Sequence, residues 1–169
     1  MSQVVAEHHA SAPQAVRCAA LTVSDTRTAA NDSGGQLLHD LLVAGGFEVV
    51  LRQIVRDDPQ VLRPLLEQLR DDEQIDAVLL TGGTGLSSRD ETFETVSALL
   101  TKPLLGYGEL FRMLSYQEIG PAAMLSRAVG GLMGRTVVLS MPGSPAAVRL
   151  ATEKLIVPEL RHLVREARR

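Results

Sequence analysis

The fold is decided by the stretch Ala77-Val78-Leu79-Leu80-Thr81-Gly82-Gly83-Thr84-Gly85. Its first residues are apolar up to the closing threonine, which is typical of a strand buried on both faces of a parallel sheet. Three glycines in four positions then let the backbone come close to an anion and present several N–H groups to it. The stretch therefore predicts a buried strand that runs into a phosphate-binding loop, although a plain turn between a strand and a helix has a similar composition.

Two similar units precede this stretch. Residues 17–24 and 48–55 read as strands, and each is followed by polar residues and then by apolar residues at helical spacing. After the glycines, another helix is expected to begin near Asp90. Three successive strand–loop–helix units predict an α/β fold, with a doubly wound, mostly parallel sheet and helices on both faces.

The C-terminal half departs from this alternation. Residues 106–109 read as a glycine-flanked loop that leads into a helix over 110–118. Residues 128–132 and 136–140 read as two strands that meet in a tight β-hairpin. A final amphipathic helix follows Pro145, and Pro158 is expected to kink or restart it. The expected fold is therefore a three-layer αβα arrangement with one β-hairpin near the C-terminal half.

Length and composition predict one domain. The chain has 169 residues, of which 45% are hydrophobic and 22% are charged, which suffices for one substantial core but not for two ordinary domains. We expect residues 17–169 to form that domain and residues 1–16 to be a disordered tail. That tail has no basic region followed by an apolar run, so it is not a secretory signal. No apolar run approaches the roughly 18 residues of a membrane span, so the cytoplasm is the expected location.

Charge and residue usage exclude several classes of function. A formal net charge of -3, 3% aromatic residues and no block of lysine or arginine argue against a nucleic-acid partner. The single cysteine, Cys18, excludes a disulfide within the chain. His39 and His162 lie in predicted helices without a second ligand at metal spacing, which argues against zinc. Any ligand pocket should therefore be lined by backbone, small residues and charges.

Two aspartates follow different strands on the same predicted edge of the sheet. Because ligands bind beyond the carboxyl ends of parallel strands, Asp57 and Asp90 are placed to hold a magnesium ion that bridges nucleotide phosphates. Either carboxylate is also compatible with a simple helix cap, and Asp58 is an alternative ligand if Asp57 is the cap.

Several other polar residues are candidates for the same crevice. Asp25 and Arg27 follow the first strand, and Asp32 introduces the first helix. Guanidinium groups pair with phosphates bidentately and keep their charge, so Arg89, Arg112 and Arg127 are candidate phosphate ligands, with surface ion pairs as the alternative. Glu109 is either a partner for the substrate or a helix cap.

In this order and spacing the motifs resemble the MoaB/Mog family, the molybdopterin adenylyltransferases. The resemblance runs from about Ala19 to the final helix. It rests on Val23-Ser24-Asp25, Asp32-Ser33-Gly34, Thr81-Gly82-Gly83-Thr84-Gly85 with Arg89-Asp90, Gly106-Tyr107-Gly108-Glu109 with Phe111-Arg112, Ser126-Arg127 and Met141-Pro142-Gly143-Ser144-Pro145.

The resemblance implies an activity and an assembly. Members of such a family would carry out a Mg²⁺-dependent reaction of ATP with molybdopterin, giving adenylylated molybdopterin and pyrophosphate, and would form homotrimers or hexamers. By motif, Asp57 and Asp90 become the catalytic and metal-binding residues. The implied substrate- and nucleotide-binding residues are Ser24, Asp25, Thr81, Gly82, Gly83, Thr84, Gly85, Glu109, Arg112, Ser126, Arg127, Pro142, Gly143 and Ser144.

Two other functions remain to be distinguished. A binding protein of the same fold would hold the pterin without releasing pyrophosphate from ATP. A signalling receiver domain also has acidic residues at the strand ends of a doubly wound sheet, but it needs an aspartate at the end of the third strand. This sequence has Thr81 and Gly82 at that position.

Overall fold

A computed structural model describes residue 13 and residues 15–169 of the chain. The predicted N-terminal tail therefore lies almost wholly outside the described residues. Its last residue, Val16, is an exception, because it is fully buried and its carbonyl accepts a hydrogen bond from the Glu48 N–H at 3.0 Å. The folded domain thus begins at least one residue earlier than the sequence predicted.

Six strands form one sheet in the described part of the chain. They are β1 (Arg17–Val23), β2 (Glu48–Val55), β3 (Ala77–Thr81), β4 (Lys102–Pro103), β5 (Val129–Met133) and β6 (Thr136–Met141). Their order across the sheet is β2-β1-β3-β6-β5-β4. The first four strands in that order run parallel, β5 pairs antiparallel with β6, and the edge strand β4 pairs antiparallel with β5. The predicted mostly parallel sheet and its β5–β6 hairpin are confirmed.

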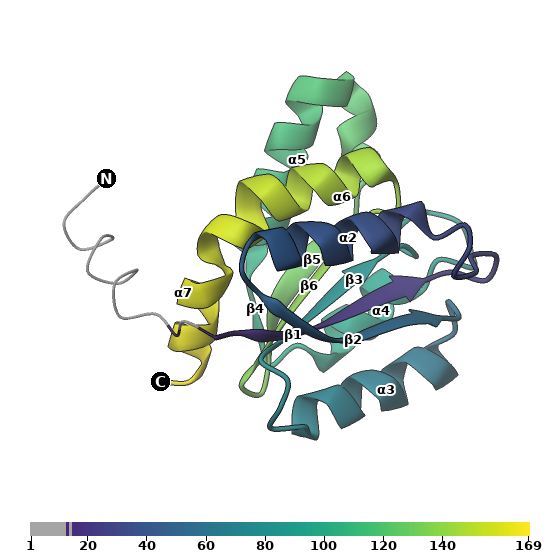
Figure 1. The fold of residues 1–169 in the computed structure, drawn as a ribbon. Coiled ribbons are helices and arrows are strands. Elements are labelled where there is room, and N and C mark those ends of the chain that lie inside the picture. Colours follow the sequence, from purple (N-terminus) through teal and green to yellow (C-terminus); the bar gives the residue numbers. More distant parts are fainter. Residues whose placement is uncertain (1–12, 14) are drawn as a thin grey trace.

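Helices cover both faces of this sheet (Figure 1). They are α2 (Ser33–Ala44), α3 (Pro59–Asp71), α4 (Thr92–Leu99), α5 (Leu105–Ile119), α6 (Pro145–Ala151) and α7 (Val157–Ala167), with a 3₁₀ segment η1 (Gly120–Leu125) and a π-helical turn η2 (Thr152–Ile156). One core joins the sheet to α2, α5, α6 and α7, and the other joins it to α3 and α4. This is the predicted three-layer α/β arrangement. None of the described helices is long and apolar enough to cross a membrane.

Short polar side chains begin three of the helices. Asp32 accepts from the Gly35 N–H at the start of α2, Asp58 from the Gln60 N–H at the start of α3, and Ser144 from the Ala147 N–H at the start of α6. Such caps satisfy backbone donors that have no partner within the helix. Because Asp58 caps α3, its neighbour Asp57 is not needed for that task.

Helix α5 begins five residues earlier than the sequence predicted. Residues 106–109 are its first turn and not a loop, which contradicts the interpretation drawn from their two glycines. The buried side chains of Tyr107 and Phe111 anchor the turn to the core. A Cβ on Gly108 would lie 2.5 Å from the Ala128 carbonyl oxygen, so the glycine permits the helix to approach β5. Tertiary packing here overrides the low helix propensity of glycine.

The C-terminal helical segment changes its winding ahead of Pro158. Residues of η2 form a π-helical turn, and α7 then continues the chain. Proline has no N–H to donate to the preceding turn, which locally breaks the α-helical ladder. The sequence predicted a kink or restart of the helix at Pro158, and the structure has a π-helical turn directly before it.

Cys18 is buried in β1 and has no role in a disulfide. Burial, together with the nearby Asp76 carboxylate, raises the pKa of the Cys18 thiol to about 12. The thiol is therefore protonated at neutral pH and packs as a small apolar group.

The buried carboxylate of Asp76 links Arg168, which follows α7, to the first strand of the sheet. Asp76, at the amino end of β3, accepts from the Arg17 N–H at 2.8 Å and from Arg168 Nη2 at 2.5 Å. Figure 1 shows the end of α7 beside the start of β1, where this contact lies. Nothing in the sequence singles out this cluster, because its three members are 59 and 92 positions apart.

We expect Asp76→Ala to lower the free energy of unfolding by about 2 kcal/mol, because it leaves partly buried donors of Arg17 and Arg168 without their acceptor. Chemical denaturation measures the loss. The matched control is Asp71→Ala, since Asp71 pairs with Arg70 on the surface and its loss should cost less than about 0.5 kcal/mol. Equal effects of the two substitutions would contradict a stabilising role for Asp76.

Candidate functional site

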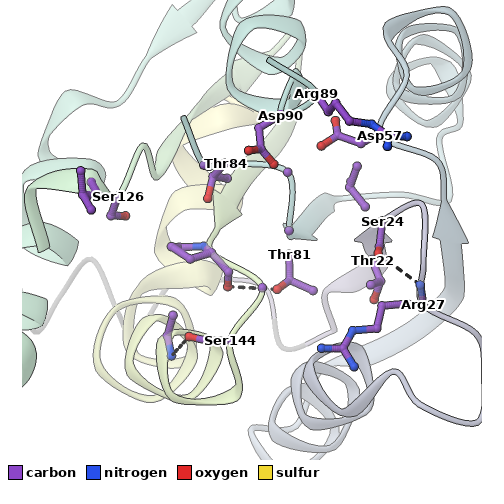
Figure 2. Close-up of a pocket in the computed structure, with 18 of the residues that line it drawn as sticks. Thr22, Ser24, Arg27, Asp57, Thr81, Thr84, Arg89, Asp90, Ser126 and Ser144 are labelled. Atoms are coloured by element: carbon purple, nitrogen blue, oxygen red, sulfur yellow. Dashed lines mark hydrogen bonds between the residues drawn. The ribbon is translucent and has the colours of Figure 1, made fainter. Parts of the chain in front are cut away.

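An open cleft lies at the carboxyl ends of β1, β3 and β6. Its volume is about 770 Å³, and it is lined by the loops that follow these strands and by one side of α5 and η1. Figure 2 shows Asp57, Asp90 and Arg89 gathered at one end, with Ser126 at the other. This is the edge where open parallel sheets bind ligands, and the sequence predicted the cleft there.

The loop at the centre of the cleft requires its glycines. Gly82 and Gly83 have φ values of +102° and +62°, which L side chains rarely adopt. A Cβ on Gly82 would lie 2.2 Å from the Val23 carbonyl oxygen, a distance that no real side chain tolerates. The loop therefore packs directly on the backbone of β1, as no other residue type would allow.

The two predicted carboxylates lie on either side of this loop. A Cβ on Gly83 would be 2.4 Å from Oδ2 of Asp57, and a Cβ on Gly85 would be 2.7 Å from Oδ2 of Asp90. Carboxylate oxygens thus occupy the space that side chains at Gly83 and Gly85 would need. Asp57 comes from the end of β2 and Asp90 from the segment before α4, so the fold brings two distant residues to one loop.

Asp57 has one oxygen engaged and one without a partner. Its Oδ1 accepts from the Glu91 N–H at 3.2 Å and from the Thr92 hydroxyl at 3.3 Å, at the start of α4. Its Oδ2 accepts no hydrogen bond from any residue that the structure describes. Asp90 uses Oδ2 to accept from the Ser87 N–H at 2.9 Å, and its Oδ1 is likewise without a donor among the described residues. One oxygen of each carboxylate is thus available to a cation.

The electrostatics of Asp57 favour a bound cation. Burial raises the pKa of the Asp57 carboxyl, and the negative charges of Asp90 and Asp25 raise it further, against the lowering effect of its two hydrogen bonds. A carboxylate in this situation is stabilised by a nearby positive charge. Clustered acidic groups with a perturbed pKa in a cleft are a common property of functional sites.

The donor set fits a magnesium ion that is completed by a substrate. Among the described residues, no three His, Cys, Asp or Glu side chains form a cluster that could hold a metal by themselves. Mg²⁺ is usually bound by one or two carboxylates together with substrate phosphates and water. Asp57 and Asp90 provide this smaller set.

The loop after β1 closes the acidic end of the cleft. Asp25 pairs with Arg89 at 2.9 Å and with Arg56 at 3.8 Å. The Ser24 hydroxyl accepts from the backbone N–H groups of Thr26 and Arg27, which stabilises a turn directly after β1. Arg89 is largely exposed, so its ion pair is weak and exchangeable for another anion.

The loop that follows β6 forms the floor of the cleft, opposite the acidic end that contains Asp25. The Thr81 hydroxyl donates to the Pro142 carbonyl at 3.2 Å, and the Gly82 N–H donates to the Met141 carbonyl at 3.0 Å. A Cβ on Gly143 would lie 3.2 Å from the Cα of Gly82, so the two loops lie in direct contact. Pro142, Gly143 and Ser144 all line the cleft, as the resemblance implied.

Three predicted binding residues lie away from this cleft. Glu109 is exposed in the first turn of α5 and does not line the cleft, so its placement in a loop is corrected, while its role in binding stays a prediction. Arg112 and Arg127 line a second cavity of about 530 Å³ between α4, α5 and β5. Ser126 borders both cavities. The remaining predicted site residues, Ser24, Asp25, Asp57, Thr81, Gly82, Gly83, Thr84, Gly85, Asp90, Pro142, Gly143 and Ser144, line the cleft.

Sequence reasoning missed the apolar wall of the cleft. Phe111, Ser115 and Ile119 recur at intervals of four on α5, and Ala122, Ala123 and Leu125 of η1 continue the wall. A spacing of four places residues on one face of a helix, so the pattern was visible. Its direction toward the cleft was not, because that depends on how α5 packs on the sheet.

Fold and cleft place the chain among α/β proteins that bind ligands at the carboxyl ends of parallel strands. The chain matches the family model described as "Probable molybdopterin binding domain" over residues 19–162. It belongs to this family, which confirms the resemblance drawn from the sequence motifs.

Relatives and solved structures agree with this membership. The chain is 53% identical over 166 residues to molybdenum cofactor biosynthesis protein B of Bacillus cereus and 49% identical over 166 residues to the protein of that name from Bacillus subtilis, with 98% of each chain covered in both comparisons. A crystal structure of molybdenum cofactor biosynthesis protein B has a TM-score of 0.89 and 54% identity, covering 93% of this chain and 98% of that one. The tungsten cofactor synthesizing protein MoaB from Pyrococcus furiosus has a TM-score of 0.81 and 35% identity, covering 94% and 100%.

We expect Mg²⁺ binding, measured by calorimetry, to weaken on acidification at a pH above the ordinary aspartate pKa of about 3.9. The reason is that the raised pKa of Asp57 lets protons compete with Mg²⁺ for its carboxylate at a higher pH.

The raised pKa of Asp57 also affects the stability of the fold. Protonated Asp57 stabilises the fold, and this contribution is lost as the pH rises through its folded pKa. Asp57→Asn, which has no such titration, should therefore be at least as stable as the unsubstituted protein at pH 7 without Mg²⁺.

Thermal unfolding at pH 7, with and without Mg²⁺, checks both statements. Mg²⁺ should raise the unfolding temperature of the unsubstituted protein and of the surface control Asp71→Asn, but not that of Asp57→Asn. Mg²⁺ binding by Asp57→Asn with undiminished affinity would remove Asp57 from the ion site.

Proposed function

We propose that this protein transfers an adenylyl group from ATP to the terminal phosphate of molybdopterin in a Mg²⁺-dependent reaction. The observation that carries the proposal is the placement of Asp57 and Asp90 on either side of the glycine loop, within one cleft. The cleft volume of about 770 Å³ falls in the range of small-molecule sites, about 300 to 1,000 Å³. Membership of the molybdopterin-binding family supplies the pterin as one of the two substrates.

The proposed step needs no covalent intermediate with the protein. A terminal phosphate oxygen of molybdopterin attacks the α-phosphorus of ATP, a new phosphorus–oxygen bond forms, and the bond to the β,γ-phosphates breaks. Pyrophosphate leaves with the electron pair of that bond. No histidine or cysteine is among the described residues that line the cleft, in keeping with direct transfer between the two substrates.

Catalysis then consists of positioning and charge neutralisation. The reaction brings several negative charges together, and preorganised cations and N–H groups must offset them. Asp57 and Asp90 would hold Mg²⁺, which supplies charge neutralisation at the phosphates. Residues 82–85 of the glycine loop line the cleft, and Arg89 lies at its edge, where it can exchange Asp25 for a phosphate.

Binding without catalysis is the second candidate function. The same cleft would hold molybdopterin and a nucleotide, and the family match concerns pterin binding alone. The two candidates differ in one product, because only the transferase releases pyrophosphate. Each of the two carboxylates has one oxygen that accepts no hydrogen bond from a described residue and could bind a cation, which favours the transferase.

We expect Asp57→Asn and Asp90→Asn each to lower the turnover number by about 100-fold or more, since each removes a negative charge from the ion site with little change of shape. The assay measures pyrophosphate released from ATP and Mg²⁺ in the presence of molybdopterin. Asp71→Asn serves as the control and should keep full activity. Absence of pyrophosphate release by the unsubstituted protein, with intact pterin binding, would favour the non-catalytic function.

We also propose that the protein assembles as a homotrimer or hexamer, as the resemblance implied. Large apolar side chains are exposed along α5 and η1, with exposed fractions of 71% for Leu105, 60% for Tyr116, 57% for Ile119 and 77% for Met124. Exposed apolar surface of this extent is typical of a subunit interface. Figure 1 shows α5 projecting beyond the sheet, where a neighbouring subunit can reach it.

Multi-angle light scattering tests the assembly. The unsubstituted protein should have a mass of three or six chains, and Tyr116→Glu should shift it toward smaller species, because a buried, unpaired carboxylate is costly at an interface. A monomeric mass for the unsubstituted protein at micromolar concentration would contradict the proposal.

A further inference from the structure

Two arginines among the described residues line the second cavity, and Arg127 makes more hydrogen bonds than Arg112. It follows η1 and precedes β5, and its guanidinium group donates four hydrogen bonds. Three acceptors are backbone carbonyls, those of Thr84 at 3.2 Å, Asp90 at 2.9 Å and Gly85. The fourth is the carboxylate of Glu94.

These contacts use nearly all the donors that the side chain has. A guanidinium group carries five N–H donors in a rigid plane, so four hydrogen bonds leave one unused. The side chain is 19% exposed, and the ring of Phe93 lies 5.1 Å from its central carbon. Arg127 is not among the residues that line the cleft. Its charge is therefore directed to the protein and away from the candidate phosphate site.

The three carbonyls belong to the segment that carries Asp90. Between β3 and α4 this segment has no regular secondary structure, and the carbonyls of Thr84 and Gly85 accept from no other described residue. The Gly85 backbone lies against Asp90, since a Cβ there would be 2.7 Å from Oδ2. Arg127 thus joins both ends of the segment, at residues 84–85 and at residue 90.

We propose that Arg127 is a positioning residue, which holds the glycine loop and Asp90 in the geometry that presents the Asp90 carboxylate to the cation. It acts through the loop and does not touch the substrate. Lysine cannot replace it fully, because Nη2 of Arg127 donates to the Gly85 and Asp90 carbonyls while Nε donates to the Thr84 carbonyl, and a single ammonium group cannot stand in for both nitrogens. The consequence for catalysis rests on the proposed function, whereas the effect on the loop does not.

Hydrogen–deuterium exchange on the protein without ligands tests the effect on the loop. Arg127→Ala should make the amides of residues 84–91 exchange about tenfold faster or more, because the segment loses charge-assisted hydrogen bonds to two of its parts. Free guanidinium chloride at millimolar concentration should restore slow exchange by occupying the vacated position beside Phe93. Arg149→Ala, which removes a surface arginine paired with Glu153, is the matched control and should leave these amides unchanged.

Binding and kinetic measurements test the positioning role. Arg127→Ala should weaken Mg²⁺ binding about tenfold and lower kcat more than it raises KM for ATP, with partial rescue of both by guanidinium. Unchanged exchange of residues 84–91, with weakened binding of inorganic pyrophosphate, would show that Arg127 contacts the anion directly and would overturn the proposal.

A second variant, Arg127→Lys, keeps the proposal testable if Arg127→Ala does not fold. Arg127→Lys keeps the positive charge and the long side chain, so it should fold, yet it should still show faster exchange of residues 84–91. Slow exchange and full Mg²⁺ affinity in Arg127→Lys would mean that charge alone suffices, which also overturns the proposal. Loss of the adenylylation reaction in the unsubstituted protein would leave the exchange result intact, so failure of the two proposals is distinguishable.

Discussion

The structure of the cleft depends on one steric constraint, the absence of side chains at Gly82, Gly83 and Gly85. A Cβ added at any of the three would lie between 2.0 and 2.7 Å from a neighbouring oxygen, closer than real side chains allow. Gly82 lets the loop pack on the backbone of β1, and the other two make room for Asp57 and Asp90. The glycines thus set the separation between the two carboxylates and the loop amides, and with it the space in which a cation and a phosphate can meet.

Asp57 illustrates how stability and function are combined at this position. Its Oδ1 holds the start of α4 through Glu91 and Thr92, which a neutral asparagine could also do. Its charge forms no ion pair with a described cationic side chain, and burial and two nearby aspartates oppose ionisation. A structural cap needs no such charge. The arrangement is intelligible if a cation completes the site.

The cleft has two chemically different ends. Charged side chains and the glycine loop lie near Asp57 and Asp90, whereas Phe111 and Ile119 provide an apolar wall from α5. The same helix exposes Tyr116 and other large apolar groups on its outer side. One helix therefore lines the ligand cleft and also carries several large apolar side chains that are exposed.

Local sequence determined the parallel strands, the hairpin, the glycine loop and the two aspartates at strand ends, because periodicity and turn chemistry act over a few residues. Tertiary structure decided what depends on distant contacts. The early start of α5 follows from close packing of Gly108 on β5, and Asp76 meets Arg168 across 92 positions. The direction of Arg127, toward loop carbonyls and away from the cleft, was also invisible in the sequence. A side chain's partners are set by which backbone segments the completed sheet brings beside it.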